Sequence, residues 1–140
     1  MNLKMKSLFI AIFIIIVTIV TVLVMHPWAK QPFKDLTTNE ISEVTVKLMP
    51  PDITFDLTDA DIAELVKIVN SCVIYMKDNS YTDYVGQAVH YTINKKDGTT
   101  IEITAYNPFL IIDGVGYKTK YGPCEELNSL GNKILNTNNP

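Results

Sequence analysis

The stretch Gln87–Lys120 constrains the fold most, because it contains two Asp-Gly pairs between apolar runs. Asp97-Gly98 and Asp113-Gly114 are each flanked by residues that favour β-strands, and such pairs are the strongest short-range indication of a β-hairpin. A one-residue slip in strand pairing would move a whole apolar set from the core into water, so the apolar pattern also determines the register. The stretch therefore predicts four antiparallel strands.

The register of the first hairpin follows from its alternating side chains. A two-residue loop would mix polar and apolar residues on each face. The three-residue loop Lys96-Asp97-Gly98, with its glycine in the left-handed conformation of a bulge, separates the two sets. One face then holds the pairs Ile93 with Ile101, Tyr91 with Ile103, and Val89 with Ala105. The second hairpin joins Phe109–Ile112 to Val115–Thr119, and its uninterrupted apolar strand predicts cover on both faces.

Another hairpin and a helix precede this stretch. Ser42–Leu48 and Ile53–Leu57 alternate in polarity, and a four-residue loop between them places their six core-facing apolar side chains on one face. Thr58 follows as a helix N-cap, with Asp61 three residues further on. Apolar residues at helical spacing then extend the predicted helix to Ser71.

The last helix is predicted to have Pro123 in its first turn, with Glu125 and Glu126 complementing its dipole. Residues 73–76 are an optional extra strand. The order is therefore β-β-α-β-β-β-β-α. We expect an α+β domain over 40–136, in which one antiparallel sheet of hairpins carries two helices on one face. Residues 137–140 are predicted to be a frayed tail.

The N-terminal region has a different composition. Leu8–Met25 carries no charge over 18 residues, which at a rise of about 1.5 Å per residue crosses most of a hydrocarbon core of about 30 Å. Lys4 and Lys6 precede this run and favour an N-terminus inside the cell. Because His26-Pro27-Trp28-Ala29 is a poor cleavage site, an uncleaved transmembrane anchor is favoured over a cleaved signal peptide.

The sequence thus predicts a single-pass protein of the cell membrane. Residues 1–7 are cytoplasmic, 26–39 form a stalk, and the C-terminal domain is extracellular. After Pro27 the chain has ten lysines, no arginine and fifteen acidic residues, a net charge of −5. This charge argues against nucleic acid as a partner, because cationic contacts to phosphate dominate such binding, and also against docking on anionic lipid.

Few residues of the exported part could carry out catalysis. His90 is its one histidine, and a strand position beside Thr104 and Glu102 indicates a structural or surface role. Because the sequence has none of the spacings typical of metal, nucleotide or hydrolase sites, we expect no metal, no cofactor and no catalytic residue. Cys72 and Cys124 have three interpretations: an extracellular disulfide, two buried apolar residues, or a low-pKa nucleophile at Cys124.

The polar loop Lys77–Gly86 is the candidate binding site. Tyr81 and Tyr84 lie in this loop beside Asp83, and aromatic residues on loops often anchor a partner. The alternative is that both rings fold back and cover the sheet edge. We expect the loop to contact a partner protein or an envelope ligand, with neighbouring charges setting its orientation.

Three segments resemble a known exported domain: PFKDL at 32–36, VIYMKDNSYTDYVGQAV at 73–89 and AYNPFLIIDGVGYKTKYGPCEELN at 105–128. That domain is attached to the C-terminal side of some Firmicute membrane metallopeptidases of the beta-lactam-sensor antirepressor type. The resemblance implies a Gram-positive, cell-surface, non-catalytic module that senses or binds something. The present sequence contains neither the multi-span peptidase nor its zinc motif.

The predicted function is therefore a membrane-anchored extracellular binding or sensor-accessory domain that is not an enzyme. The second hypothesis is an inhibitor or interaction partner of a cell-envelope protein, and it differs from the first only in the partner. The third is a small secreted enzyme that uses Cys124 or His90. The lack of a visible constellation of nucleophile, base and acid weighs against that enzyme.

Overall fold

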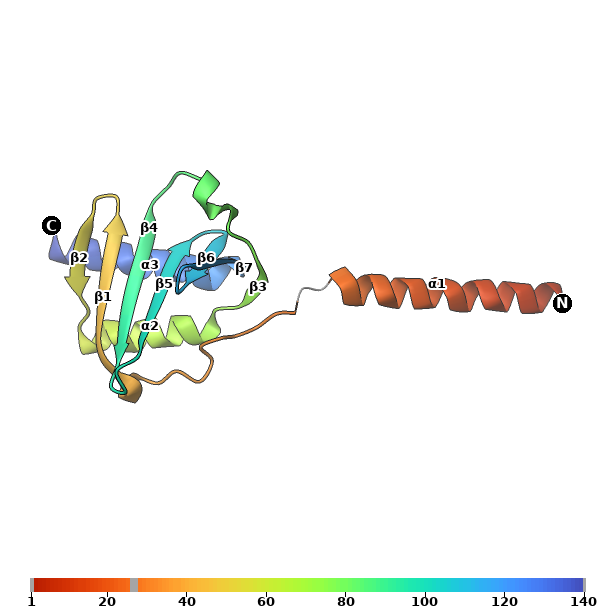
Figure 1. Cartoon of the computed structure of the whole chain (residues 1–140), viewed down its shortest axis with the longest axis horizontal. Coiled ribbons are helices and arrows are strands. Elements are labelled where there is room, and N and C mark those ends of the chain that lie inside the picture. Colours follow the sequence, from red (N-terminus) through yellow and green to blue (C-terminus); the bar gives the residue numbers. More distant parts are fainter. Residues whose placement is uncertain (1, 26–27, 140) are drawn as a thin grey trace.

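The computed structural model describes residues 2–25 and 28–139, which form one apolar helix and one α+β domain (Figure 1). The helix α1 (Leu3–Met25) is long and apolar enough to cross a membrane, and its side chains are exposed from Leu3 to Val24. It begins before the predicted span, so Lys4 and Lys6 lie in its first turn. His26 and Pro27, part of the predicted uncleaved junction, lie outside the described residues.

The domain is built on a seven-stranded sheet with the order β2-β1-β4-β5-β6-β7-β3, in which every neighbouring pair is antiparallel. The strands are β1 (Ile41–Met49), β2 (Ile53–Asp56), β3 (Ile74–Lys77), β4 (Ala88–Lys95), β5 (Thr100–Tyr106), β6 (Phe109–Ile112) and β7 (Val115–Thr119).

Two helices, α2 (Asp59–Ser71) and α3 (Tyr121–Asn138), lie behind the sheet in Figure 1, and their buried residues belong to one core with it. Two short 3-10 helices, η1 (Thr38–Glu40) and η2 (Ser80–Asp83), lie in connections. The predicted α+β fold, with its helices on one face, is confirmed, and β3 is the optional extra strand.

The strand registers follow the alternation of apolar side chains. In β4 and β5 the three predicted apolar pairs lie opposite one another, and Gly98 has a φ of 86°. In β1 and β2, Leu48 pairs with Ile53 and Val46 with Phe55, as predicted. The continuous apolar strand β6 is covered on both faces, since Phe109, Leu110 and Ile111 are all buried.

The boundaries of α2 follow the sequence, whereas those of α3 do not. Thr58 accepts a hydrogen bond of 3.2 Å from the Asp61 N–H and caps α2, which ends at Ser71 as predicted. The helix α3 begins at Tyr121, so Glu125 and Glu126 lie beyond its first turn and the predicted dipole complement was wrong.

The helix α3 also continues further than predicted, to Asn138. Ile134 is buried, and its carbonyl oxygen accepts a hydrogen bond of 2.8 Å from the Asn138 side chain. Packing of Ile134 on the core therefore holds the last turn of the helix. The prediction of a frayed tail from residue 137 was accordingly wrong for Thr137 and Asn138.

The segment predicted to be a stalk lies largely against the domain. Lys30 exchanges two backbone hydrogen bonds of 2.9 Å each with Ile74, the first residue of β3. Leu36 is buried, and Phe33 packs against the core. A stalk over 26–39 is thus contradicted from Lys30 onwards, because this part of the chain buries Leu36 in the core and packs the half-buried Phe33 against it.

Candidate functional site

The sheet has one face that neither helix covers, which we call the open face. Residues of β1, β4 and β5 alternate between the core and this face, so the neighbours of the buried Val89, Tyr91 and Ile93 point outward. At one end, this face is polar. His90 lies there, with its Nδ1 2.7 Å from Thr104 Oγ1 and its Nε2 3.3 Å from Thr92 Oγ1.

The connection from β3 to β4, residues 78–87, passes over the open face, and we call it the crossing loop. It must traverse β7, β6 and β5, because these strands separate β3 from β4 in the sheet. Its first part is fixed to β7 by two hydrogen bonds of 2.8 Å at Gly116: the Asp78 N–H donates to the Gly116 carbonyl, and the Gly116 N–H donates to Asn79 Oδ1.

Hydrogen bonds of the Asp78 and Gln87 side chains fix the two ends of the crossing loop. Hydrogen bonds from the hydroxyl and backbone N–H of Ser80 hold the pKa of Asp78 below its usual range, with a smaller contribution from Lys118. At the other end, the Gln87 side chain donates to the Pro50 carbonyl at 3.0 Å and accepts from Asn132 at 2.9 Å. The loop is thus tied to the β1–β2 turn and to α3.

The two candidate tyrosines fold back onto the sheet, as the alternative interpretation of the sequence proposed, but they cover the inner strand β6 and not an edge. The ring centroids of Tyr81 and Tyr84 lie 6.3 and 5.4 Å from that of Phe109, both tilted, and Phe109 is only 2% exposed. Tyr84 nevertheless remains 58% exposed, and Asp83 is exposed beside it. The rings therefore cover β6 rather than extend freely into solvent.

A pocket of about 260 Å³ lies on the open face beside Tyr81. It is lined by residues from β1, β4, β5, β6 and the crossing loop: Met49, Tyr81, Ala88, Thr104, Tyr106 and Ile111. The pocket borders the polar end of the face, because Thr104 is the threonine that contacts His90 Nδ1. A mainly apolar and aromatic wall with a few hydroxyl groups is typical of a binding site.

The sequence indicated the loop of this site but missed its pocket. Phe109, Tyr106 and Met49 are distant in the sequence from Tyr81, so only the folded sheet brings them together. One signal was present, since a glycine inside a strand often marks a close approach of another backbone. Gly116 is such a residue, because the crossing loop lies directly over it.

The two cysteines and the histidine do not form a catalytic group. Cys124 is buried behind the sheet, where its thiol donates to the Phe109 carbonyl at 3.4 Å, whereas His90 lies on the open face. Burial raises the pKa of both Cys72 and Cys124 to about 12, so Cys124 is not the low-pKa nucleophile considered from the sequence. Both are free buried thiols, and the structure contains no disulfide between them.

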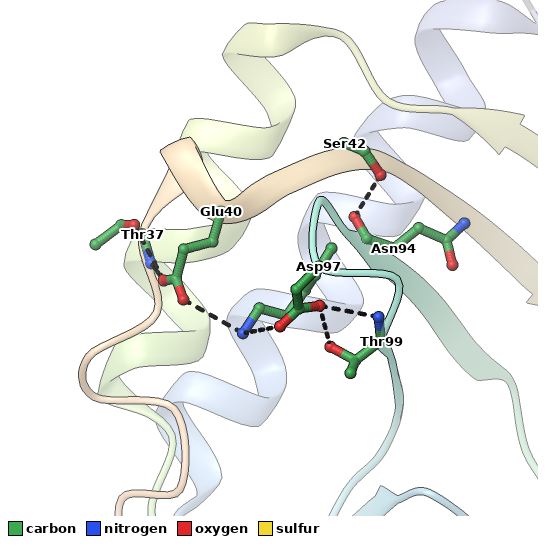
Figure 2. Close-up of polar contacts among 7 residues, drawn as sticks. Thr37, Glu40, Ser42, Asn94, Asp97 and Thr99 are labelled. Atoms are coloured by element: carbon green, nitrogen blue, oxygen red, sulfur yellow. Dashed lines mark hydrogen bonds and ion pairs between the residues drawn. The ribbon is translucent and has the colours of Figure 1, made fainter.

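A second polar cluster joins η1 to the β4–β5 turn (Figure 2). Glu40 accepts hydrogen bonds from the N–H and hydroxyl of Thr37 at 2.9 and 3.0 Å and lies 3.3 Å from Lys95 Nζ. Asp97 accepts two bonds from Thr99, at 2.9 and 2.6 Å. The pKa values of Glu40 and Asp97 are lowered mainly by their threonine partners. Because these groups bind one another, the cluster serves the fold.

No group of three or more His, Cys, Asp or Glu side chains within residues 2–25 and 28–139 is arranged to hold a metal ion. Comparisons of the chain with protein-family models, with curated proteins and with solved structures gave no match. The pocket and the crossing loop on the open face, with their apolar and aromatic side chains, are the candidate binding site.

Proposed function

We propose that α1 anchors the chain in a cell membrane as a single span, with the α+β domain outside the cell, and that the domain binds a partner protein through its open face without catalysing a reaction. The observation that carries this proposal is the pocket beside Tyr81. It lies on the open face of the sheet, which neither α2 nor α3 covers, so a partner can reach it.

The size and lining of the pocket favour a protein partner. Its volume of about 260 Å³ is at the small end of the range of roughly 300–1,000 Å³ that is usual for small-molecule sites. Tyrosines line it, and tyrosine is enriched among the few side chains that dominate protein–protein binding. Next to it, Tyr84 and Val85 are exposed on the crossing loop. We infer that one apolar side chain of the partner enters the pocket while the exposed loop contacts its surroundings.

The chemistry of the titratable groups supports binding rather than catalysis. His90 is held between two threonine hydroxyls, and the thiols of Cys72 and Cys124 are buried on the other side of the sheet with raised pKa values. A nucleophile of this kind needs an adjacent base and access to substrate. The arrangement favours a non-catalytic module.

The N-terminal helix and the resemblance noted in the sequence support the location. Lys4 and Lys6 at the start of α1 favour an N-terminus inside the cell. The resemblance to an exported module of antirepressor-type membrane proteins fits a sensor-accessory role at the cell surface. We therefore propose that the partner is another protein of the cell envelope.

The location can be tested by adding protease to intact protoplasts that contain the full-length chain. We expect digestion of the domain and survival of a fragment that contains α1. Full protection of the domain would contradict the proposed orientation. A mature chain that begins near Lys30 would contradict the proposed anchor.

The binding face can be tested by filling the pocket. Ala88→Leu adds bulk at the pocket, whereas Ala63→Leu makes the same change at an exposed position of α2. We expect Ala88→Leu to reduce co-purification of the envelope partner from solubilised membranes at least tenfold, while Ala63→Leu leaves it unchanged. Equal recovery of the partner with both variants, at equal melting temperatures, would place the interaction elsewhere.

A further inference from the structure

We propose that the domain docks on the bilayer that carries α1, through one edge of the sheet in contact with anionic lipid headgroups. The β3 edge, as we call this surface, consists of six exposed side chains: Trp28, Lys30, Met76, Lys77, Lys118 and Lys120. The proposal rests on the anchoring role of α1 given above. It identifies the lipid surface itself, rather than a protein, as the partner of this edge.

The path of the chain brings the β3 edge to the membrane. The helix α1 ends at Met25, and Lys30 is already fixed to Ile74 by two backbone hydrogen bonds. Five extended residues reach at most about 18 Å, so Lys30 lies no further than this from the end of the span. Since β3 is one outer strand of the sheet and β2 the other (Figure 1), the tether holds the sheet with its β3 side nearest the bilayer.

Two exposed apolar side chains lie at this edge. Lys30 and Ile74 form an isolated antiparallel bridge, and Trp28 and Met76 lie two residues before Lys30 and two residues after Ile74. Trp28 is 87% exposed and Met76 is 58% exposed. Tryptophan concentrates at the level of lipid headgroups, where its ring satisfies both an apolar and a polar surrounding. The pair therefore suits the interface of the bilayer better than open water.

Exposed lysines lie on the strands and connections of this edge, although the domain as a whole is acidic. Lys77 ends β3, Lys118 lies in β7, and Lys120 follows β7, where its N–H donates to the Val73 carbonyl at 3.0 Å. Asp78 lies 3.9 Å from Lys118 and offsets part of the charge. A cation close to an anionic leaflet is attracted to it, so these lysines favour docking of this edge.

The overall charge of −5 argues against lipid docking only when it is averaged over the whole domain. Four of the ten lysines after Pro27 lie at the β3 edge, so this surface differs from the average. Docking by this edge also orients the plane of the sheet perpendicular to the membrane. The open face then points along the membrane, towards proteins anchored beside this one.

The test uses full-length protein in phosphatidylcholine vesicles, with and without phosphatidylglycerol, that contain brominated lipids as quenchers of tryptophan fluorescence. Trp28 is the single tryptophan, so the natural chain reports insertion of the anchor. In a Trp28→Phe chain, Met76→Trp reports the β3 edge and Thr54→Trp reports the far edge on β2. We expect at least twofold stronger quenching for Met76→Trp than for Thr54→Trp in the presence of phosphatidylglycerol.

A charge-reversal pair completes the test. In the Met76→Trp chain, the double substitution Lys77→Glu with Lys120→Glu should lower the quenching to that of the Thr54→Trp chain. The double substitution Lys67→Glu with Lys96→Glu gives the same net charge and should leave the quenching of the Met76→Trp chain unchanged. Quenching at Trp28 without excess quenching at Met76→Trp would overturn the docking alone. Absence of quenching at Trp28 would overturn the anchor and the docking with it. Unchanged quenching but self-association after Lys77→Glu with Lys120→Glu would show that the lysines protect a sheet edge instead.

Discussion

At Gly116 the crossing loop approaches the sheet more closely than a side chain would permit. A Cβ atom added there would overlap the Asp78 carbonyl oxygen and lie 2.7 Å from Tyr81 Cδ1. The position of Tyr81 at the pocket therefore depends on the absence of a side chain in β7. At the sequence level Gly116 is explained by a turn and a strand alone, which is why its role emerges only with the folded loop.

We predict that Gly116→Ala lowers the free energy of unfolding by about 1–3 kcal/mol, because the added methyl group must displace the loop or the ring. The matched control is Gly122→Ala in α3, where an added Cβ meets no atom of the described residues within 4 Å. This control should be neutral or slightly stabilising, since alanine favours a helix. Denaturant unfolding of both variants checks the prediction, and equal midpoints would contradict the close approach.

The thiols of Cys72 and Cys124 should be unreactive in the folded protein. Burial raises their pKa from 9.0 to about 12, so very little thiolate exists at pH 8. The unfolded chain loses these protons near pH 9 while the folded chain retains them. The free energy of unfolding should therefore fall as the pH rises from about 9 to 12.

Thiol titration with a chromogenic disulfide reagent distinguishes the three interpretations of the cysteines. We expect no reaction before unfolding and two thiols per chain in denaturant. A fast reaction of one thiol in the folded protein would point to a nucleophile at Cys124. Failure to find any thiol after unfolding would reveal a disulfide.

At the scale of elements, the hairpins could be predicted from the sequence and the ends of the chain could not. Alternation of apolar residues fixes which face of β4 and β5 enters the core, and this local rule determined the register. The capping residues Thr58 and Asp61 likewise set the start of α2 locally. The course of residues 30–36 instead depends on Ile74 and on the core, which no local pattern in that segment reveals.

The docked segment should contribute to the stability of the domain. Leu36 is buried, so Leu36→Ala is expected to lower the free energy of unfolding by about 2–5 kcal/mol. Lys34→Ala, two residues earlier at an exposed position, should change it by no more than about 0.5 kcal/mol. Thermal melting of the two variants measures the difference. Equal melting temperatures would restore the interpretation of this segment as a free stalk.

At the scale of the whole molecule, the sequence indicated one loop of the candidate site and the fold supplied the rest. Tyr81, Asp83 and Tyr84 stood out because an otherwise polar loop contained two aromatic rings. Their orientation depends on Phe109, and the pocket depends on four strands that meet only in the sheet. The sequence alone could not show that both rings pack on Phe109 of β6, nor that Tyr84 remains 58% exposed while it does so.

Cross-linking from two faces of the full-length protein in intact cells tests most directly whether the open face binds a partner. A photoreactive amino acid is placed either at Tyr84, beside the pocket, or at Lys67, which is exposed on α2 on the opposite side of the sheet. We expect a discrete cross-linked envelope protein from position 84 that disappears with Ala88→Leu, and none from position 67. Equal cross-linking from both positions, or a product from position 84 that Ala88→Leu leaves unchanged, would contradict binding through the open face.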